Sequence, residues 1–341
     1  MASYARKEII RPNQVAVYHC WATTLPRMVL CGKKGKKDYD HRKEWIRARL
    51  VQMSEVFAVE VCGYAINKDR LDVVIRVRPD VAKKWSKEEV AQRWKMIHPQ
   101  DRDRELEFGT VKPSKQQTRE LLADKAQLEE CRKRLCDVTW FVRDLCEAVA
   151  RRMNREERRK GRVWYGRFRT RQVLDAPAAL ATCVAIEASP LLGGCTADIA
   201  QGGYSSACDR IAGAKTRARA RARAPRAKDP DAWLNPLDAT KARGKTPAKS
   251  AFPMNPSDYV KLVEWTGKQL AAKKQDASPP ADIAAVLKKM GLDPENWLEF
   301  VANLDERFTR AVGSPALMAK EAKRIGKSWF RGHIHAEEAY L

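Results

Sequence analysis

Two charged side chains lie in the most strongly β-forming stretch of the chain. Residues 57–78 read FAVEVCGYAINKDRLDVVIRVR, two runs rich in valine and isoleucine that a polar corner at 67–69 separates. This pattern predicts two adjacent antiparallel strands near the middle of a sheet. Because strand side chains alternate between faces, Arg70 and Asp72 should project from one face and Leu71 from the other. We interpret Arg70 and Asp72 as a paired arginine and carboxylate; exposure of both to solvent is the alternative.

A second candidate is the basic block at residues 151–171, which reads RRMNREERRKGRVWYGRFRTR. It holds ten lysines and arginines against two glutamates, with Trp164, Tyr165 and Phe168 among them. Guanidinium groups bind phosphates and aromatic rings stack on unpaired bases, so this mixture is typical of nucleic-acid binding. The alternative is a solvated arginine face with the aromatic rings packed beneath it.

Two further basic segments fit the same interpretation. Residues 30–40 (LCGKKGKKDYD) should form a polar loop, and residues 215–225 read KTRARARARAP. The formal charge of +23 favours a polyanionic partner, nucleic acid before a membrane surface. The predicted nucleic-acid contacts are Lys33, Lys34, Lys36, Lys37, Arg151, Arg152, Arg155, Arg158, Arg159, Lys160, Arg162, Trp164, Tyr165, Arg167, Arg169, Arg171, Arg217, Arg219, Arg221 and Arg223.

The residues that most often bind metals give weak signals. His19 lies within an expected strand at 15–21, where a histidine is most often a hydrogen-bonded core residue. His333 and His335 form a histidine pair near the C-terminus, which alone is poor evidence for a metal site. The nine cysteines lie singly and without CxxC pairs, which indicates reduced, buried thiols rather than zinc ligands. We therefore predict no metal.

The remaining pattern predicts an α+β protein. Helices are expected at 41–56, with Asp40 as N-cap, at 86–96, within 115–159 and at 178–188. The predicted division is a nucleic-acid-binding domain at 1–213, a flexible basic linker at 214–252 and a small all-α domain at 253–341. The N-terminus lacks the apolar stretch of a signal peptide, and no run of about 18 apolar residues predicts a membrane span.

The order of these elements resembles the REP-associated tyrosine transposases of the single-tyrosine HUH endonuclease superfamily. The similarity covers roughly residues 8–195 and is most specific at GRVWYGRF (161–168), with Asn154 a few residues upstream. The resemblance implies a ferredoxin-like αβ core with an antiparallel sheet. In that family the sheet carries a metal site and an adjacent helix carries the tyrosine nucleophile.

The chain departs from that family at both parts of the active site. Relatives carry Asn-His-hydrophobic-His on the strand, where two imidazoles hold a divalent metal; residues 69–72 here read Asp, Arg, Leu, Asp. A guanidinium is always charged and cannot ligate a cation. The family's tyrosine would fall about five residues before Asn154, where Val149 or Ala150 stands. The degenerate catalytic positions are therefore Arg70, Asp72 and Val149.

We therefore predict a transposase-like protein that binds hairpin or single-stranded DNA without cleaving it, as a monomer or homodimer. One alternative is an active transposase or endonuclease that uses Tyr165 and Mg²⁺ or Mn²⁺; otherwise no cofactor is expected. Another alternative is an RNA-binding component of a ribonucleoprotein. The expected location is the bacterial cytoplasm, with association to the nucleoid as an option.

Overall fold

A mixed five-stranded sheet organises the computed structural model, which describes residues 6–99, 113–220, 229–237, 250–274 and 276–341. The strand order is β4-β5-β1-β6-β7. The strands are β1 (Ala16–Thr23), β4 (Val59–Ile66), β5 (Arg70–Val77), β6 (Arg169–Val173) and β7 (Ala311–Val312), and a separate hairpin pairs β2 (Lys33–Lys34) with β3 (Lys37–Asp38). Neighbours from β4 to β6 are antiparallel, whereas β7 runs parallel to β6. The protein is thus α+β, although the sheet is not purely antiparallel as predicted.

The predicted hairpin at 57–78 is confirmed as β4 and β5. The backbone N–H of Asn67 donates to the carbonyl of Arg70, which closes the turn. Its place in the sheet differs from the prediction, because β4 is the edge strand of the described sheet. A segment far along the chain covers that edge: the N–H of Asn235 donates to the carbonyl of Val61 over 2.7 Å.

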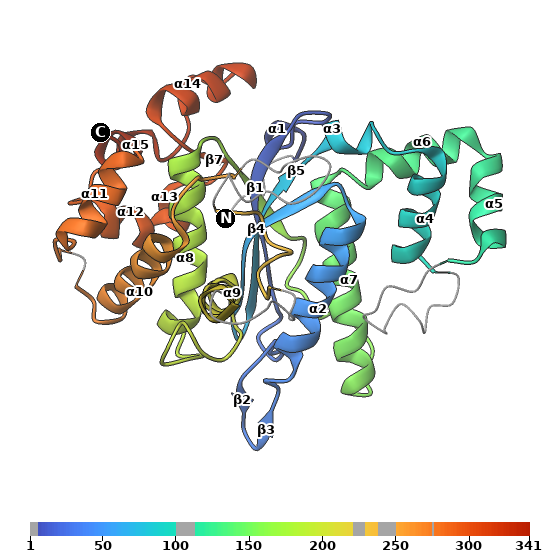
Figure 1. Ribbon diagram of the computed structural model, residues 1–341, viewed down its shortest axis with the longest axis horizontal. Helices are drawn as coiled ribbons and strands as arrows, with labels where there is room; N and C mark the ends of the chain where they lie inside the picture. Colours follow the sequence, from blue (N-terminus) through green and yellow to red (C-terminus); the bar gives the residue numbers. More distant parts are fainter. Residues whose placement is uncertain (1–5, 100–112, 221–228, 238–249, 275) are drawn as a thin grey trace.

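Helices α2 (Arg42–Val56) and α7 (Val138–Glu156) cover one face of the sheet (Figure 1). Their apolar residues pack with Leu71, Val73 and Ile75, as the strand alternation predicts. Helices α4 (Lys87–Ile97), α5 (Lys115–Ala123) and α6 (Lys125–Arg134) extend this side. In chain order the four antiparallel strands and the helices α2 and α7 read β1-α2-β4-β5-α7-β6.

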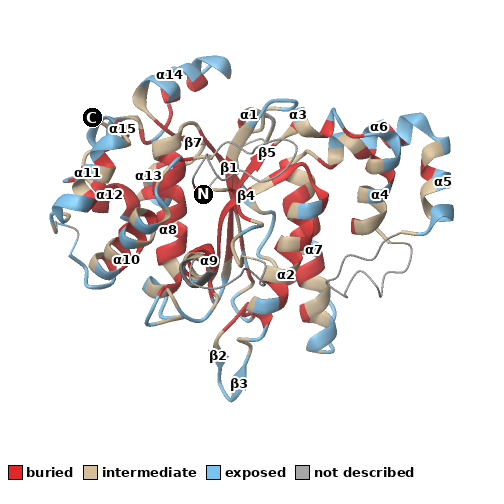
Figure 2. Cartoon of the chain, viewed as in Figure 1, coloured by how far each residue is buried: buried red, intermediate tan, exposed pale blue. Residues whose placement is uncertain are grey.

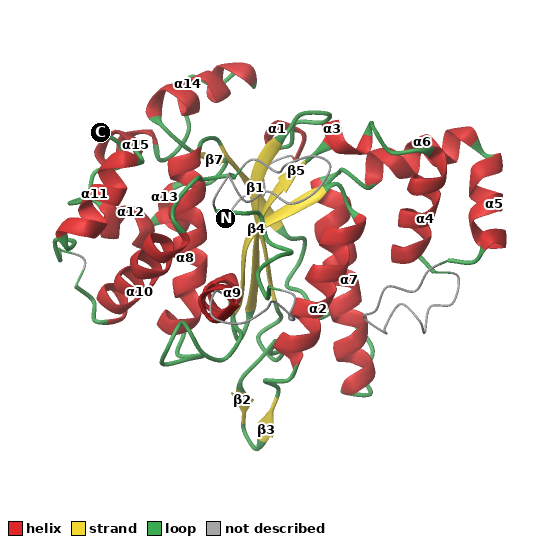
Figure 3. Ribbon diagram, in the orientation of Figure 1, coloured by secondary structure: helices red, strands yellow, loops and turns green. Residues whose placement is uncertain are grey.

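The other face of the sheet is covered by α8 (Ala176–Leu192) together with helices of residues 256–341, which we call the C-terminal segment (Figures 1 and 3). Val74 of β5 lies in the same buried cluster as Leu180 of α8 and Tyr259 of the C-terminal segment. That segment therefore shares a core with the sheet and adds β7 to it. Its helices are α10 (Pro256–Ala271), α11 (Ala281–Lys289), α12 (Trp297–Ala302), α13 (Leu304–Arg307), α14 (Pro315–Arg324) and α15 (His333–Ala339).

Part of the segment predicted as a flexible linker is packed against the sheet. Residues up to 220 complete α9 (Ser206–Ala220), and Leu234 and Leu237 are buried. The linker was predicted from the average composition of the segment, which is basic and rich in proline, so these single apolar residues carried little weight. Residues 221–228 and 238–249 of the predicted linker lie outside the described residues.

Several local predictions can be checked as well. The N-cap of α2 is His41; Asp40 instead accepts from the backbone N–H of Gly32 over 3.0 Å. The helical pattern predicted within 115–159 is confirmed, as the three helices α5, α6 and α7. All nine cysteines are free thiols, five buried and four half-buried. The two short helices not yet located are α1 (Arg6–Ile9) and α3 (Pro79–Ala82). Among the described helices, none has the length and apolar character needed to cross a bilayer.

Candidate functional site

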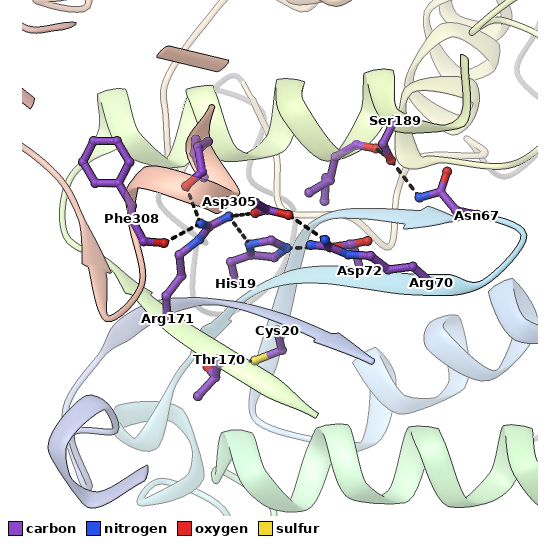
Figure 4. A network of polar contacts seen from close by, with 12 residues as sticks. His19, Cys20, Asn67, Arg70, Asp72, Thr170, Arg171, Ser189, Asp305 and Phe308 are labelled. Carbon is purple, nitrogen blue, oxygen red and sulfur yellow. Dashed lines mark hydrogen bonds and ion pairs between the residues drawn. The ribbon is translucent and has the colours of Figure 1, made fainter. Parts of the chain in front are cut away.

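Arg70 and Asp72 form the ion pair that the strand pattern predicts. The Nε and Nη2 atoms of Arg70 donate to Oδ1 of Asp72 over 3.0 and 2.7 Å. Both side chains point to the sheet face that α8 and the C-terminal helices cover (Figure 4). Asp72 is almost fully buried there, and the guanidinium supplies the positive charge that a buried carboxylate requires.

His19 of β1 connects this pair to the neighbouring strand. Its Nε2 lies 2.8 Å from Oδ1 of Asp72, and its Nδ1 lies 2.8 Å from Nη2 of Arg171. Since a guanidinium only donates, Nδ1 must accept, which assigns the neutral tautomer with the proton on Nε2. Burial and the charge of Arg171 lower the pKa of His19, despite the opposing effect of Asp72. The predicted role of His19 as a hydrogen-bonded core residue is confirmed.

Arg171 is buried, so the prediction that it is an exposed contact for nucleic acid, like the other basic residues of 151–171, is wrong. It stands opposite His19 in the pairing of β1 with β6 and is fully enclosed. Its Nη1 donates to the carbonyls of Leu304 and Phe308 over 2.8 and 2.9 Å. These two residues lie 133 and 137 positions further along the chain, which is why the local basic pattern at 151–171 did not indicate them.

Asp305 of α13 completes the group and was not singled out from the sequence. Its carboxylate pairs with Nη1 of Arg70 over 2.6 Å and also with Nη2 of Arg171. Burial would raise the pKa of Asp305, but the two guanidinium groups outweigh it and hold that pKa well below its usual range. We call the five residues His19, Arg70, Asp72, Arg171 and Asp305 the arginine–aspartate cluster (Figure 4).

The charges of the arginine–aspartate cluster balance, with two guanidinium groups, two carboxylates and a neutral imidazole. Trp21 lies against it: its ring centroid is 5.1 Å from the guanidinium carbon of Arg70 and 5.3 Å from that of Arg171. The guanidinium groups occupy oxygens that a cation would need as ligands. Within the described residues, no group of three histidine, cysteine, aspartate or glutamate side chains gathers as a metal site requires. His333 and His335 lie beside Glu337 and Glu338 on α15.

Val149, the predicted degenerate nucleophile position, does not belong to the same site as Arg70 and Asp72. It lies on α7 and packs in the core on the α2 and α7 side of the sheet. The arginine–aspartate cluster is on the opposite side, where α8 runs over it (Figure 4). A longer side chain at position 149 would therefore have to cross the sheet to reach Asp72. Helix α8, which runs over the cluster, contains no tyrosine either.

A strongly basic surface lies at one end of the molecule. The β2–β3 hairpin and the end of α7 with its following loop both reach this end, and both are largely exposed (Figure 2). Arg42, at the start of α2, donates to Glu156 at the end of α7 over 3.0 Å and to the following residue, Glu157, over 2.6 Å. We call this surface the cationic end; its exposed basic residues are Lys33, Lys34, Lys36, Lys37, Arg155, Arg158, Lys160, Arg162, Arg167 and Arg169.

Tyr165 projects from the cationic end, whereas its neighbour Trp164 does not. Tyr165 is 70% exposed, and its backbone N–H donates to the carbonyl of Thr23 over 2.8 Å, which fixes the loop at the end of β1. The indole N–H of Trp164 donates to the carbonyl of Cys146 over 2.8 Å, and its ring packs on the core. Trp164 is half-buried, so it presents less surface to a ligand than Tyr165 does, and its contact with nucleic acid stays a prediction.

Four other predicted basic contacts have partners within the protein. Arg151 pairs with Glu147 over 3.1 Å, and Arg217 pairs with Asp231 over 2.6 Å. Arg152 lies over the ring of Trp45, and Arg159 donates to the sulfur of Met28. The side chain of Arg219 and all of Arg221 and Arg223 lie outside what the structure describes.

The described chain is thus an α+β protein with a buried, charge-balanced cluster on one sheet face and a basic surface at one end. No protein-family model matches it, and no curated protein or solved structure is detectably similar to it.

Proposed function

We propose that this protein binds single-stranded or hairpin nucleic acid at the cationic end and does not cleave it. The observation that carries the proposal is an exposed aromatic ring, Tyr165, fixed among exposed lysines and arginines. Phosphates pair with the basic side chains, while an unpaired base stacks on the tyrosine ring. A fully paired duplex offers no free base face, which favours single strands and hairpin loops as the ligand.

The proposal includes descent from a transposase-like ancestor with a ferredoxin-like core. The order β1-α2-β4-β5-α7-β6 and the strand order β4-β5-β1-β6 are those of a ferredoxin-like βαββαβ unit, which supports it. The paired state of Arg70 and Asp72 supports the loss of the metal site, because both side chains have become partners of one another. Fold alone does not specify function, so the binding surface carries the functional part of the proposal.

Replacing Lys33, Lys34, Lys36 and Lys37 together by alanine should weaken binding and reduce its dependence on salt. Each lysine that contacts a phosphate contributes about 0.7 to the slope of log K against log salt concentration for a single strand, so the slope should fall by up to about 3. The measurement is fluorescence anisotropy of a labelled DNA hairpin and its RNA equivalent over a series of NaCl concentrations.

A matched control replaces four exposed lysines of the C-terminal segment, Lys288, Lys289, Lys320 and Lys327, by alanine. This variant loses the same net charge away from the cationic end and should keep most of the salt slope. Equal slopes for the two variants would mean that the β2–β3 hairpin of the protein does not contact phosphates of the nucleic acid. Binding that is unchanged between low and moderate salt in the unaltered protein would contradict the proposed function itself.

Tyr165→Ala should reduce the affinity for a single strand by about 5- to 150-fold, because stacking contributes about 1–3 kcal/mol per base. Tyr165→Phe should retain most of the affinity, since the ring remains. The control is Trp329→Ala, which removes another exposed ring, 64% exposed, from the C-terminal segment. If alanine at 165 weakens single-strand and duplex binding equally, or not at all, the ring is not a stacking platform.

A further inference from the structure

The carboxylate of Asp305 bridges two arginines in the way that a small anion would. One of its oxygens faces Nη1 of Arg70 over 2.6 Å and the other pairs with Nη2 of Arg171. The two arginines come from β5 and β6, on either side of β1, whereas Asp305 comes from α13, far along the chain. The cluster therefore contains two guanidinium groups on the sheet and one anionic group that a separate segment inserts between them.

Other partners hold both guanidinium groups in place. Arg70 donates two hydrogen bonds to Asp72, and Arg171 is held by His19 and by the carbonyls of Leu304 and Phe308. Removing only the carboxylate of Asp305 would thus leave two oriented guanidinium groups facing one position. Paired, fixed guanidinium groups match the geometry of a phosphate group as well as that of a carboxylate.

Solvent reaches this position. The side chain of Asp305 is 43% exposed and that of Arg70 is 27% exposed, although Arg171 is enclosed. The position is also close to the cationic end, because Arg70 pairs with Thr23 in the sheet and the N–H of Tyr165 donates to the carbonyl of the same Thr23. A strand held at Tyr165 would therefore run near Arg70.

We propose that Arg70 and Arg171 form a binding site for a phosphate group, and that Asp305 is an internal anion that occupies it. The site takes a free phosphate or a phosphate of nucleic acid; only the second source rests on the proposed function. Asp305 acts as a competitor, so the site is weak in the unaltered protein and becomes available when the carboxylate is removed.

Asp305→Ala should therefore create a response to inorganic phosphate. Alanine vacates the position between the two arginines and leaves Asp72 as the one remaining carboxylate of the cluster. The thermal midpoint of this variant should rise by about 5 °C in saturating phosphate relative to chloride at equal ionic strength, while the unaltered protein shifts much less. The control is Asp282→Ala, which removes an exposed 3.0 Å ion pair with Lys261 and lowers the negative charge equally.

The outcomes separate this site from the cationic end. A phosphate shift in Asp305→Ala no larger than in Asp282→Ala would overturn the proposal. If Asp305→Ala is unfolded in chloride, recovery of its folded circular dichroism signal by phosphate supports the site, and absence of recovery overturns it. Tighter binding of a 5′-phosphorylated than of a 5′-hydroxyl oligonucleotide by Asp305→Ala would identify nucleic acid as the source, whereas a response to inorganic phosphate alone would identify free phosphate. The response to inorganic phosphate does not depend on the four lysines of residues 33–37. The variant that lacks them tests the cationic end separately.

Discussion

Replacing Arg171 by methionine should destabilise the folded protein by about 3–5 kcal/mol, the usual cost of removing one partner from a buried ion pair. Methionine fills much of the same volume, so the effect isolates the guanidinium group. Its loss leaves the carbonyl of Phe308 and the Nδ1 atom of His19 without the donor that Arg171 supplies, and the carbonyl of Leu304 keeps only the backbone N–H of Phe308. It also leaves Asp72 and Asp305 to share Arg70 alone, so the cluster acquires a net negative charge. Urea denaturation followed by circular dichroism measures the change.

Strand β6 supplies a matched control two residues earlier. Arg169→Met removes the same charge from the exposed start of the strand and should change the free energy of unfolding by about 0.5 kcal/mol or less. Hydrogen exchange should also become faster near β7 in Arg171→Met, because the N–H of Gln172 donates to the carbonyl of Arg310 beside the cluster. Similar stability of the two variants would show that the cluster does not fasten the C-terminal segment to the sheet.

The features that the sequence predicted correctly depend on residues close together in the chain or in one hairpin. Strand alternation placed Arg70 and Asp72 on one face, and a separation of two residues brings their charged ends together. The exposed lysines of residues 33–37 also follow from local composition, because a glycine- and lysine-rich loop has nothing to bury. Tyr165 was included among the predicted contacts and is indeed exposed.

The errors arise where a distant segment decides the environment. Arg171 belongs to the same basic pattern as Arg169, but only Arg171 is covered by the segment around Leu304. Trp164 and Tyr165 are adjacent and aromatic, yet Trp164 is half-buried and Tyr165 is exposed, and the loop has no periodicity from which this difference could be predicted. Asp305 carried no signal, since one carboxylate in a helical region resembles a solvated surface residue.

The C-terminal segment can pack on the sheet because it neutralises the charges of the arginine–aspartate cluster. A sheet face bearing charged side chains can be covered only if those charges are neutralised and hydrogen-bonded. Asp305 supplies the missing negative charge, and the carbonyls of Leu304 and Phe308 accept hydrogen bonds from Nη1 of Arg171. Under the proposed descent from a transposase-like ancestor, the position of the former metal site is now the place where this segment is attached.

A second buried acid, Glu187 of α8, should make stability depend on pH. It is enclosed between helices, where it accepts hydrogen bonds from the hydroxyls of Ser206 and Tyr259, the latter over 2.7 Å. Burial raises its pKa from 4.5 to about 7, against the opposing charge of Arg210. Because the folded-state pKa is the higher one, the contribution of Glu187 to stability is fully present below pH 4.5 and is lost as the pH rises through about 7. At 1.36 kcal/mol per pKa unit, the loss amounts to about 3 kcal/mol.

Glu187→Gln should remove this dependence on pH. When the pH rises from below 4.5 to above 7, the stability of the variant relative to the unaltered protein should therefore increase by about 3 kcal/mol. The amide can be accommodated, because it can donate to Ser206 while the Ser206 hydroxyl turns to the carbonyl of Tyr64, 3.2 Å away. The measurement is the free energy of unfolding in urea for the variant and the unaltered protein, below pH 4.5 and above pH 7. The quantity of interest is how much the difference in stability between the two proteins changes between these two pH values. Glu129→Gln, an exposed glutamate paired with Arg132 over 3.3 Å, loses the same charge and should show almost no change. A constant difference between Glu187→Gln and the unaltered protein across the range would mean that Glu187 keeps one protonation state throughout, and that the hydroxyls of Ser206 and Tyr259 together with Arg210 stabilise its charge as well as water does.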